Sequence, residues 1–102
     1  MTRSIEAHAI VWRGITIEIR YEERWLGGDG PFSTAHLQVF ARAPERVVLP
    51  ITETGYRSHF TPAAVIAEAG GPVIFVQAWL DTEADRPAWR EREERARQMT
   101  LF

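Results

Sequence analysis

The stretch from Ile15 to Glu22 alternates between apolar and polar side chains. Its apolar members are Ile15, Ile17, Ile19 and Tyr21, and its polar members are Thr16, Glu18, Arg20 and Glu22. A period of two is typical of a half-buried strand, because successive side chains of a strand point to opposite faces. The segment therefore predicts a sheet with one covered face and one face exposed to water.

The residues before this strand predict its hairpin partner. With Arg13-Gly14 as a two-residue turn, Trp12 pairs with Ile15, Ile10 with Ile17 and His8 with Ile19. Gly14 can supply the positive φ of such a turn, whereas Arg13 is an unfavourable residue for it. The other face of the first strand carries an apolar strip, which we expect a helix or a second subunit to cover; a homodimer is thus one expectation. The strip consists of Ile5, Ala7, Ala9 and Val11.

Further extended segments follow a Gly-rich loop at residues 26–31. We predict strands at 35–42, 47–49 and 55–60, with a turn at 44–46 and Pro50 ending the 47–49 strand or placing it at a sheet edge. After Phe60 helix signals replace the alternation. The expected helices are 63–69, 72–84 and 87–99. The second of them opens with the β-branched string Val73 to Val76, which would also suit a buried strand.

Strands first and helices afterwards indicate an α+β fold. We expect an antiparallel sheet of four or five strands over residues 5–60, covered by C-terminal helices. A chain of 102 residues supports one hydrophobic core, so residues 1–102 are predicted to form a single domain.

Composition excludes several classes of function. The chain has no cysteine, which removes disulfides and thiolate nucleophiles. A net charge of -2 disfavours strong nonspecific nucleic-acid binding. The three histidines lack metal-ligand spacing, so we expect neither a metal nor another cofactor. Neither a secretion signal nor a membrane-spanning segment is recognisable, so we expect no membrane partner and a cytoplasmic protein.

The candidate site lies in the polar string from Ile51 to Phe60. In an extended chain Glu53, Arg57 and His59 share one face, where a guanidinium and an imidazole can hold an anionic group. The alternative is an ordinary solvated sheet face with Tyr56 and Phe60 turned into the core.

Trp25, beside the Gly-rich loop, is the tryptophan that we expect to touch a partner. Ser58 and His59 are adjacent on a strand and point to opposite faces, so they do not form a nucleophilic pair. No residue is therefore assigned a catalytic role.

The string Ile-Thr-Glu-Thr-Gly-Tyr-Arg-Ser-His-Phe at 51–60 is followed by Gly-Gly-Pro-Val at 70–73 and Ala-Trp-Leu-Asp at 78–81. This pattern resembles a small protein family of bacterial plasmids and other mobile elements, over about the last half of the chain. The resemblance implies a cytoplasmic accessory role in mobile-element maintenance or host interaction, and it transfers no catalytic residue or substrate.

We therefore expect a small noncatalytic binding module that contacts a protein or nucleic-acid partner through Arg57 and His59, with Glu53 and Trp25 nearby. Two alternatives stay open. A nucleic-acid-binding accessory protein would need Arg20, Arg42 and Arg57 to converge on one sheet face. An enzyme acting on an anionic ligand would need a concave pocket that contains Arg57 and His59.

Overall fold

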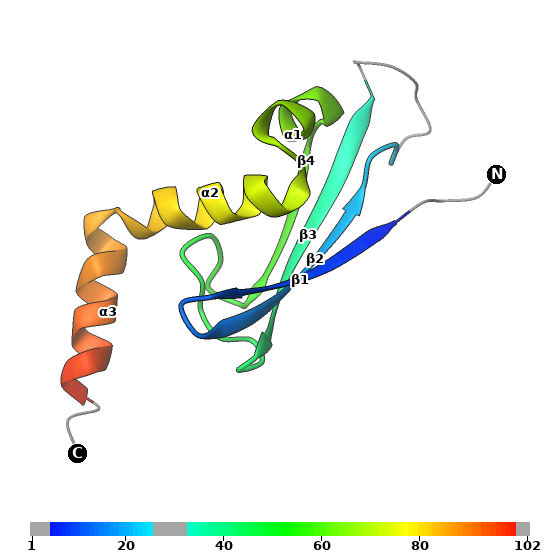
Figure 1. Ribbon diagram of the computed structural model, residues 1–102. Helices are drawn as coiled ribbons and strands as arrows, with labels where there is room; N and C mark the ends of the chain where they lie inside the picture. Colours follow the sequence, from blue (N-terminus) through cyan, green and yellow to red (C-terminus); the bar gives the residue numbers. More distant parts are fainter. Residues whose placement is uncertain (1–4, 26–32, 100–102) are drawn as a thin grey trace.

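The chain folds into one antiparallel sheet followed by three helices, as a computed structural model shows (Figure 1). The structure describes residues 5–25 and 33–99, so the Gly-rich segment 26–31 lies outside the described residues. The strands are β1 (Glu6–Trp12), β2 (Ile15–Glu22), β3 (Thr34–Ala43) and β4 (Tyr56–Pro62). The helices are α1 (Ala63–Ala69), α2 (Pro72–Ala84) and α3 (Pro87–Met99). The predicted α+β class is confirmed.

The sheet has four strands in the order β1-β2-β3-β4, so each strand pairs with its neighbour in the chain. A fifth strand at 47–49 does not form. This segment belongs to the connection between β3 and β4, where Leu49 and Thr52 make an isolated bridge. Leu49 and Ile51 are buried there, so the connection is held by core packing in place of strand pairing.

The predicted register of the first hairpin is confirmed. Trp12 pairs with Ile15, Ile10 with Ile17 and His8 with Ile19. Both turn residues have positive φ, 48° at Arg13 and 81° at Gly14, as a tight turn that follows the twist of the strands requires. Arg13 takes up this unfavourable backbone conformation while its guanidinium lies over the Trp12 ring at 4.8 Å.

The segments 63–69 and 72–84 are both helical, as predicted. Gly70, with φ of 105°, ends α1, and Pro72 stands at the beginning of α2, where its missing amide donor costs nothing. The strand alternative for 72–84 is wrong because the buried positions Val76, Leu80 and Ala84 recur every four residues, which is the spacing of one helix face.

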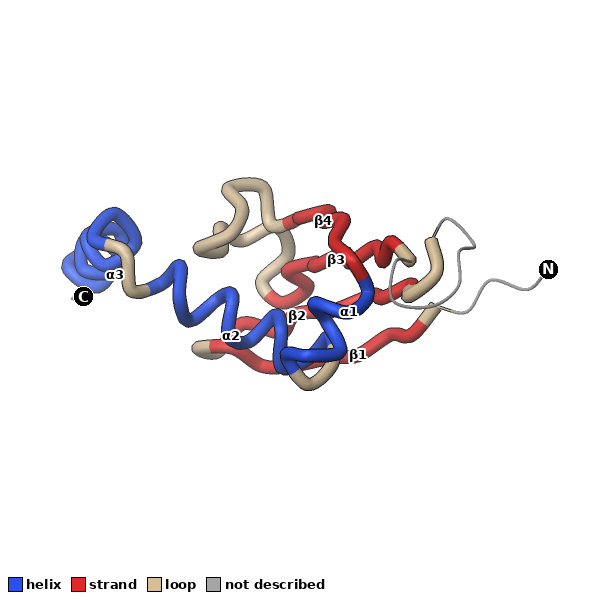
Figure 2. The backbone as a smooth tube through the Cα atoms, turned by 90° about the horizontal axis from the view of Figure 1, so that it is seen from above, coloured by secondary structure: helices blue, strands red, loops and turns tan. Residues whose placement is uncertain are grey.

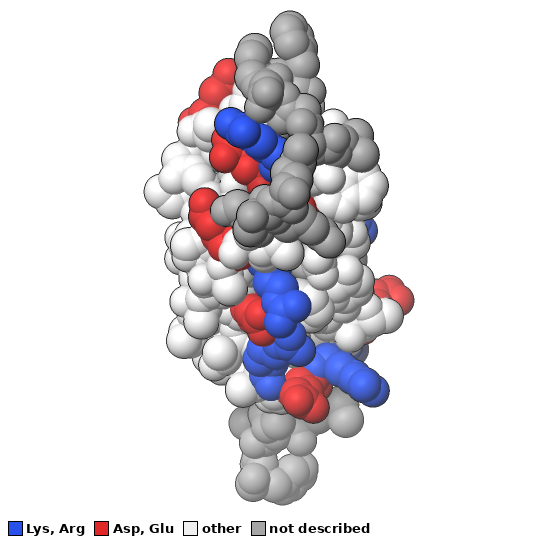
Figure 3. Space-filling view, turned by 90° about the vertical axis from the view of Figure 1, so that its right-hand side faces the viewer, with Lys and Arg blue, Asp and Glu red and all other residues white. Residues whose placement is uncertain are grey.

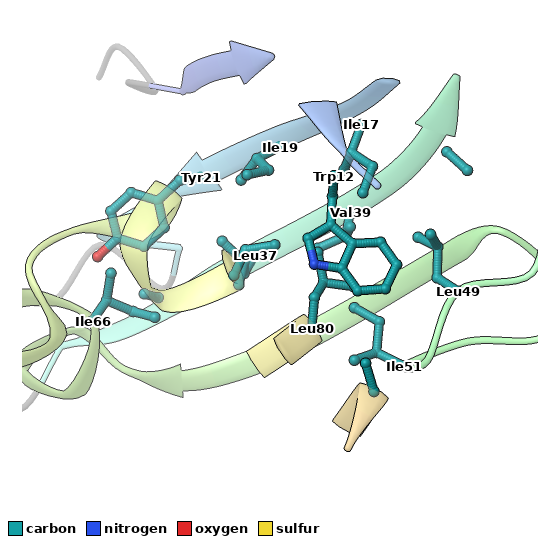
Figure 4. Close-up of a cluster of buried hydrophobic side chains, with 14 of the residues drawn as sticks. Trp12, Ile17, Ile19, Tyr21, Leu37, Val39, Leu49, Ile51, Ile66 and Leu80 are labelled. Carbon is teal, nitrogen blue, oxygen red and sulfur yellow. The ribbon is translucent and has the colours of Figure 1, made fainter. Parts of the chain in front are cut away.

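The hydrophobic core lies between one face of the sheet and the helices (Figures 2 and 4). From the sheet come Trp12, Ile17, Ile19, Tyr21, Leu37 and Val39, and from the helices Ile66, Val76, Leu80 and Ala84. Figure 2 shows α2 crossing the sheet, whereas α3 lies beyond its end. Trp89 of α3 packs against Trp12 with ring centroids 6.3 Å apart.

The opposite face of the sheet, called the open face, is not covered by any helix among the described residues. The β1 part of this face is the apolar strip of Ile5, Ala7, Ala9 and Val11, and Val11 is 71% exposed. Among the described residues, no helix of this chain covers the strip. No single described helix has the length and composition to cross a membrane, although α1 and α2 pass that test as a bent pair.

Candidate functional site

Arg57 and His59 share a face of β4, as expected, but that face is the one that carries the helices. In the register of β3 with β4, Arg57 lies opposite Val39 and His59 opposite Leu37. Val39 and Leu37 are fully buried core residues, and residues paired across an antiparallel sheet point to the same side. The two side chains therefore project to the side of the sheet that carries the helices, where Arg57 is exposed and His59 is half-buried.

Two aromatic rings of α2 lie beside His59. Its imidazole lies 4.8 Å from the Trp79 ring and 6.0 Å from the Phe75 ring. Burial lowers the pKa of His59 below its usual 6.5, and the nearby charge of Arg57 lowers this pKa further. The Arg57 guanidinium lies over the same Trp79 ring at 5.6 Å. This pair therefore ties β4 to α2 by ring packing and a cation–π contact.

Tyr56 and Phe60 occupy the open face, so the alternative that placed them in the core is wrong. They lie opposite Phe40 and His36 of β3 and are 42% and 49% exposed. β4 is an edge strand with polar and aromatic residues on both faces. The register of β4 with β3 determines whether Arg57 and His59, or Tyr56 and Phe60, face the helices.

The four residues predicted as one site are divided between three places. Trp25 stands on the open face beside Phe60 and His36. Arg57 and His59 lie on the helix side. Glu53 is exposed in the connection that precedes β4.

Three rings form a stack at one end of the open face. The imidazole of His36 lies parallel to the Phe60 ring, with centroids 4.3 Å apart and an interplanar angle of 7°. Trp25 meets Phe60 edge to face at 4.7 Å. The His36 Nε2 and Ser58 Oγ atoms are 2.7 Å apart, a hydrogen bond that orients the imidazole. Trp25 nevertheless stays 40% exposed, so the stack presents aromatic surface to solvent.

A second aromatic pair lies toward the other end of the same face. The Phe40 and Tyr56 rings are 4.9 Å apart, and the Tyr56 hydroxyl donates a hydrogen bond to Gln38 Oε1 at 3.4 Å. Two guanidinium groups lie over Phe40, that of Arg42 at 4.3 Å and that of Arg20 at 5.3 Å. We call the five rings of the two groups the aromatic platform; its members are Trp25, His36, Phe40, Tyr56 and Phe60.

One carboxylate holds the two arginines in place. Glu18 accepts hydrogen bonds from Arg20 Nε at 2.6 Å and from Arg42 Nε at 2.8 Å. These hydrogen bonds, that of Arg20 first, lower the pKa of Glu18 below its usual 4.5. We call Glu18, Arg20 and Arg42 the charged stripe. It separates the platform from the apolar strip of β1, and it carries one net positive charge.

Positive and negative side chains are interleaved on the surface (Figure 3). Seen from the right of Figure 1, arginines gather in a band that also contains acidic side chains. Among the described residues no group of His, Asp and Glu is placed to hold a metal ion.

Most platform residues were not singled out by sequence reasoning. The alternation did show that His36, Gln38, Phe40 and Arg42 share one face of their strand, and that Tyr56 and Phe60 share one face of theirs. The missing information was the pairing of the two strands, which places His36 next to Phe60 and Phe40 next to Tyr56. Of the three arginines named for a nucleic-acid surface, Arg20 and Arg42 converge, whereas Arg57 lies on the opposite face.

Comparison with known protein families identifies one match. The family model described as KlcB third domain matches residues 5–89, which include all four strands, α1 and α2. No curated protein and no solved structure matches the chain.

Proposed function

The chain belongs to the KlcB third-domain family, and we propose that it is a small noncatalytic binding module whose contact surface is the open face of its sheet. The distribution of exposed apolar side chains carries this proposal. Among the described residues, the large hydrophobic side chains most open to solvent are Ile5, Val11, Trp25, Tyr56, Phe60, Val65 and Ile74. The first five belong to the open face or continue its alternation, and the other two lie on α1 and α2.

Apolar and aromatic side chains gathered on one face favour a partner, because monomeric proteins bury or disperse such surface. Ring stacking and the Glu18 hydrogen bonds also hold the side chains of the face in defined positions. Such order lowers the entropy that would be lost when a partner binds. Arg57 and His59 contribute differently, since they hold β4 against α2 beneath the same strand.

The proposed setting is the cytoplasm, in an accessory role for a mobile element. This part of the proposal is supported by the sequence resemblance at 51–60, 70–73 and 78–81. Deleting the coding sequence from an element that carries it should lower the retention or transfer of that element. Unchanged retention and transfer would contradict the accessory role and leave the binding surface unaffected.

The chain offers a matched pair of variants to test the surface. Tyr56→Ser with Phe60→Ser removes two rings from the open face, at positions 42% and 49% exposed. Val65→Ser with Ile74→Ser removes similarly exposed side chains, 41% and 52%, from the helical side. We expect cross-linking capture in the native host to recover partners with the wild type and with the helical-side variant, and to lose them with the open-face variant.

Circular dichroism and thermal melting should establish that both double variants fold before capture is compared. Equal recovery by the open-face variant and the wild type would overturn the assignment of the contact surface. Equal loss in both double variants would overturn it as well, because the loss would then not depend on the face.

A further inference from the structure

We propose that the aromatic platform, together with Arg20 and Arg42 but without Arg57, binds single-stranded nucleic acid; this inference rests on the proposed function and names the partner of the same surface. The first observation is the composition of two strands. From His36 to Arg42 and from Tyr56 to Phe60, the side chains on the open face are His36, Gln38, Phe40, Arg42, Tyr56, Ser58 and Phe60. This set contains no carboxylate and no aliphatic side chain. Rings interleaved with guanidinium groups are the usual surface for stacked bases and phosphates.

The β1 side of the open face has a different composition from the β3 and β4 side. This difference indicates which part of the face would suit a protein and which part would suit a nucleic acid. On the β1 side the exposed side chains are the aliphatic residues Ile5, Ala7, Ala9 and Val11. Protein interfaces are built on an apolar core with few charges. Around the platform, in contrast, arginine side chains lie next to Phe40. The amide group of Gln38 and the hydroxyl group of Ser58 lie between the rings. These polar groups can form hydrogen bonds with base edges, while the rings stack on base faces.

Spacing favours a single strand over a duplex. Tyr56 and Phe60 are four positions apart on β4, or about 13 Å at the rise of an extended chain. Bases in a duplex follow one another at about 3.4 Å along each strand. Bases that stack on the two rings would therefore be splayed apart, which a single strand permits and a duplex resists.

The charged stripe supplies the phosphate contacts. Arg20 and Arg42 bind Glu18 through their Nε atoms, and no other hydrogen bond of either guanidinium is observed among the described residues. Their terminal amino groups can therefore bind phosphate oxygens while Glu18 fixes the orientation of both side chains. Glu22, opposite His36, is the other acidic residue on this face of β2 and is buried. Two phosphate contacts predict a weak dependence of binding on salt.

Fluorescence anisotropy with labelled ten-nucleotide oligo-dT, oligo-U and a ten-base-pair duplex tests the inference on the full chain. We expect saturable binding of the single strands, and weaker binding of the duplex, at about 20 mM salt. With two phosphates contacted, the logarithm of affinity should fall against the logarithm of salt with a slope of about -1.4. Phe60→Leu and Tyr56→Leu should each weaken binding by about 5- to 150-fold, the usual effect of losing one stacked base.

Two arginines provide matched variants. Arg42→Gln should weaken binding and reduce the salt slope by about 0.7, since the variant binds one phosphate fewer. Arg57→Gln also removes a guanidinium that lies over a ring, but on the helix side, so it should leave affinity unchanged. Thermal melting should confirm that every variant compared is folded.

Three results would overturn the inference: no saturable binding of either single strand at low salt, tighter binding of the duplex, or equal effects of Arg42→Gln and Arg57→Gln. If one of these results appears while open-face variants still lose partners in the capture experiment, the platform binds another partner and the proposed function stands. If the capture experiment fails too, both proposals fail.

Discussion

The indole nitrogen of Trp12 donates a hydrogen bond to the carboxylate of Asp81, 69 positions away in the chain, at 2.9 Å. Trp12 is 6% exposed, so Asp81→Ala leaves a buried N–H without this acceptor. We expect the variant to lower the free energy of unfolding by about 1–3 kcal/mol. Urea denaturation measures this loss, and Thr82→Ala, at the exposed neighbouring position, should change stability by less than about 0.5 kcal/mol.

A double-mutant cycle separates this hydrogen bond from other effects of Asp81. In a Trp12→Phe background, which has no donor, Asp81→Ala should cost less than about 0.5 kcal/mol because no hydrogen bond is left to break. A cost as large as in the wild type would show that Asp81 acts through other contacts.

Trp89→Phe should leave stability nearly unchanged or raise it slightly. The Nε1 atom of Trp89 is buried and has no hydrogen-bond partner among the described residues. Removing an unsatisfied buried donor is favourable and offsets the weaker apolar packing of the smaller ring. Thermal melting of Trp89→Phe beside Trp12→Phe, which removes a satisfied donor, provides the comparison. A larger drop in melting temperature for Trp89→Phe would contradict this expectation.

Arg13→Gly should loosen α3 while leaving the sheet intact. The Arg13 guanidinium binds both carboxylate oxygens of Glu93, at 2.8 and 2.9 Å, and lies over Trp12. Glycine relieves the positive φ at this position but removes both interactions, so global stability should change by less than about 1 kcal/mol. Hydrogen exchange in α3 should become faster, with exchange in β2 and β3 unchanged. Equal protection of α3 in both proteins would show that this ion pair does not hold the helix.

Stability should fall as the pH drops from 7 to 5, and His59 should cause part of that fall. Because the pKa of His59 is lowered on folding, the unfolded chain binds the proton more tightly than the folded chain does. The stabilising effect is fully present above about 6.5, the ordinary pKa, and is lost as the pH falls toward the lower folded pKa.

Melting temperatures of the wild type and His59→Phe, measured at several pH values, check this expectation. The variant keeps a ring beside Trp79 and should show a flatter profile between pH 7 and 5. The lowered pKa of Glu18 acts in a more acidic range, below its usual 4.5, and should affect both proteins alike. Parallel profiles above pH 5 would argue against His59 as the titrating group.

Gly55→Ala should destabilise the protein more than Gly14→Ala. Both glycines have nearly the same positive φ, 80° and 81°, so both substitutions introduce similar backbone strain. A Cβ atom at Gly55 would also lie 2.5 Å from Arg46 Cα, whereas a Cβ atom at Gly14 would meet no described neighbour within 4 Å. Gly14→Ala should cost about 1 kcal/mol and Gly55→Ala at least about 2 kcal/mol. Equal costs in urea denaturation would mean that the connection moves aside freely.

The first hairpin and the three helices were predictable because their signals are local. Ile15 to Tyr21 alternate without interruption, a short turn sets the register, and Gly70 and Pro72 mark helix boundaries in the sequence itself. The number of strands was predictable only as four or five, since Val47 to Leu49 has strand composition but forms only the isolated bridge of Leu49 with Thr52.

The candidate site was largely unpredictable because β4 lacks a distinctive apolar face. Its sequence alternates Tyr56, Ser58 and Phe60 with Arg57 and His59, and either set suits an interior or an exterior position on an edge strand. The choice is made by pairing with β3 across a connection of twelve residues, 44–55. This pairing depends on the packing of Leu49 and Ile51 in the connection. The sequence of β4 itself contains no signal for that packing.

The chain-order sheet has a consequence for how the protein assembles. Every strand pair joins neighbours along the chain across connections of at most twelve residues, so hairpins can form one after another. The contacts of Trp12 with Asp81 and of Arg13 with Glu93 close loops of far greater length. We expect them to form after the rate-limiting step, with φ-values near zero for Asp81→Ala and higher values within β2 and β3. The turn of the first hairpin would then form early in folding. Only at the end would it bind the C-terminal helices, through Trp12 and Arg13.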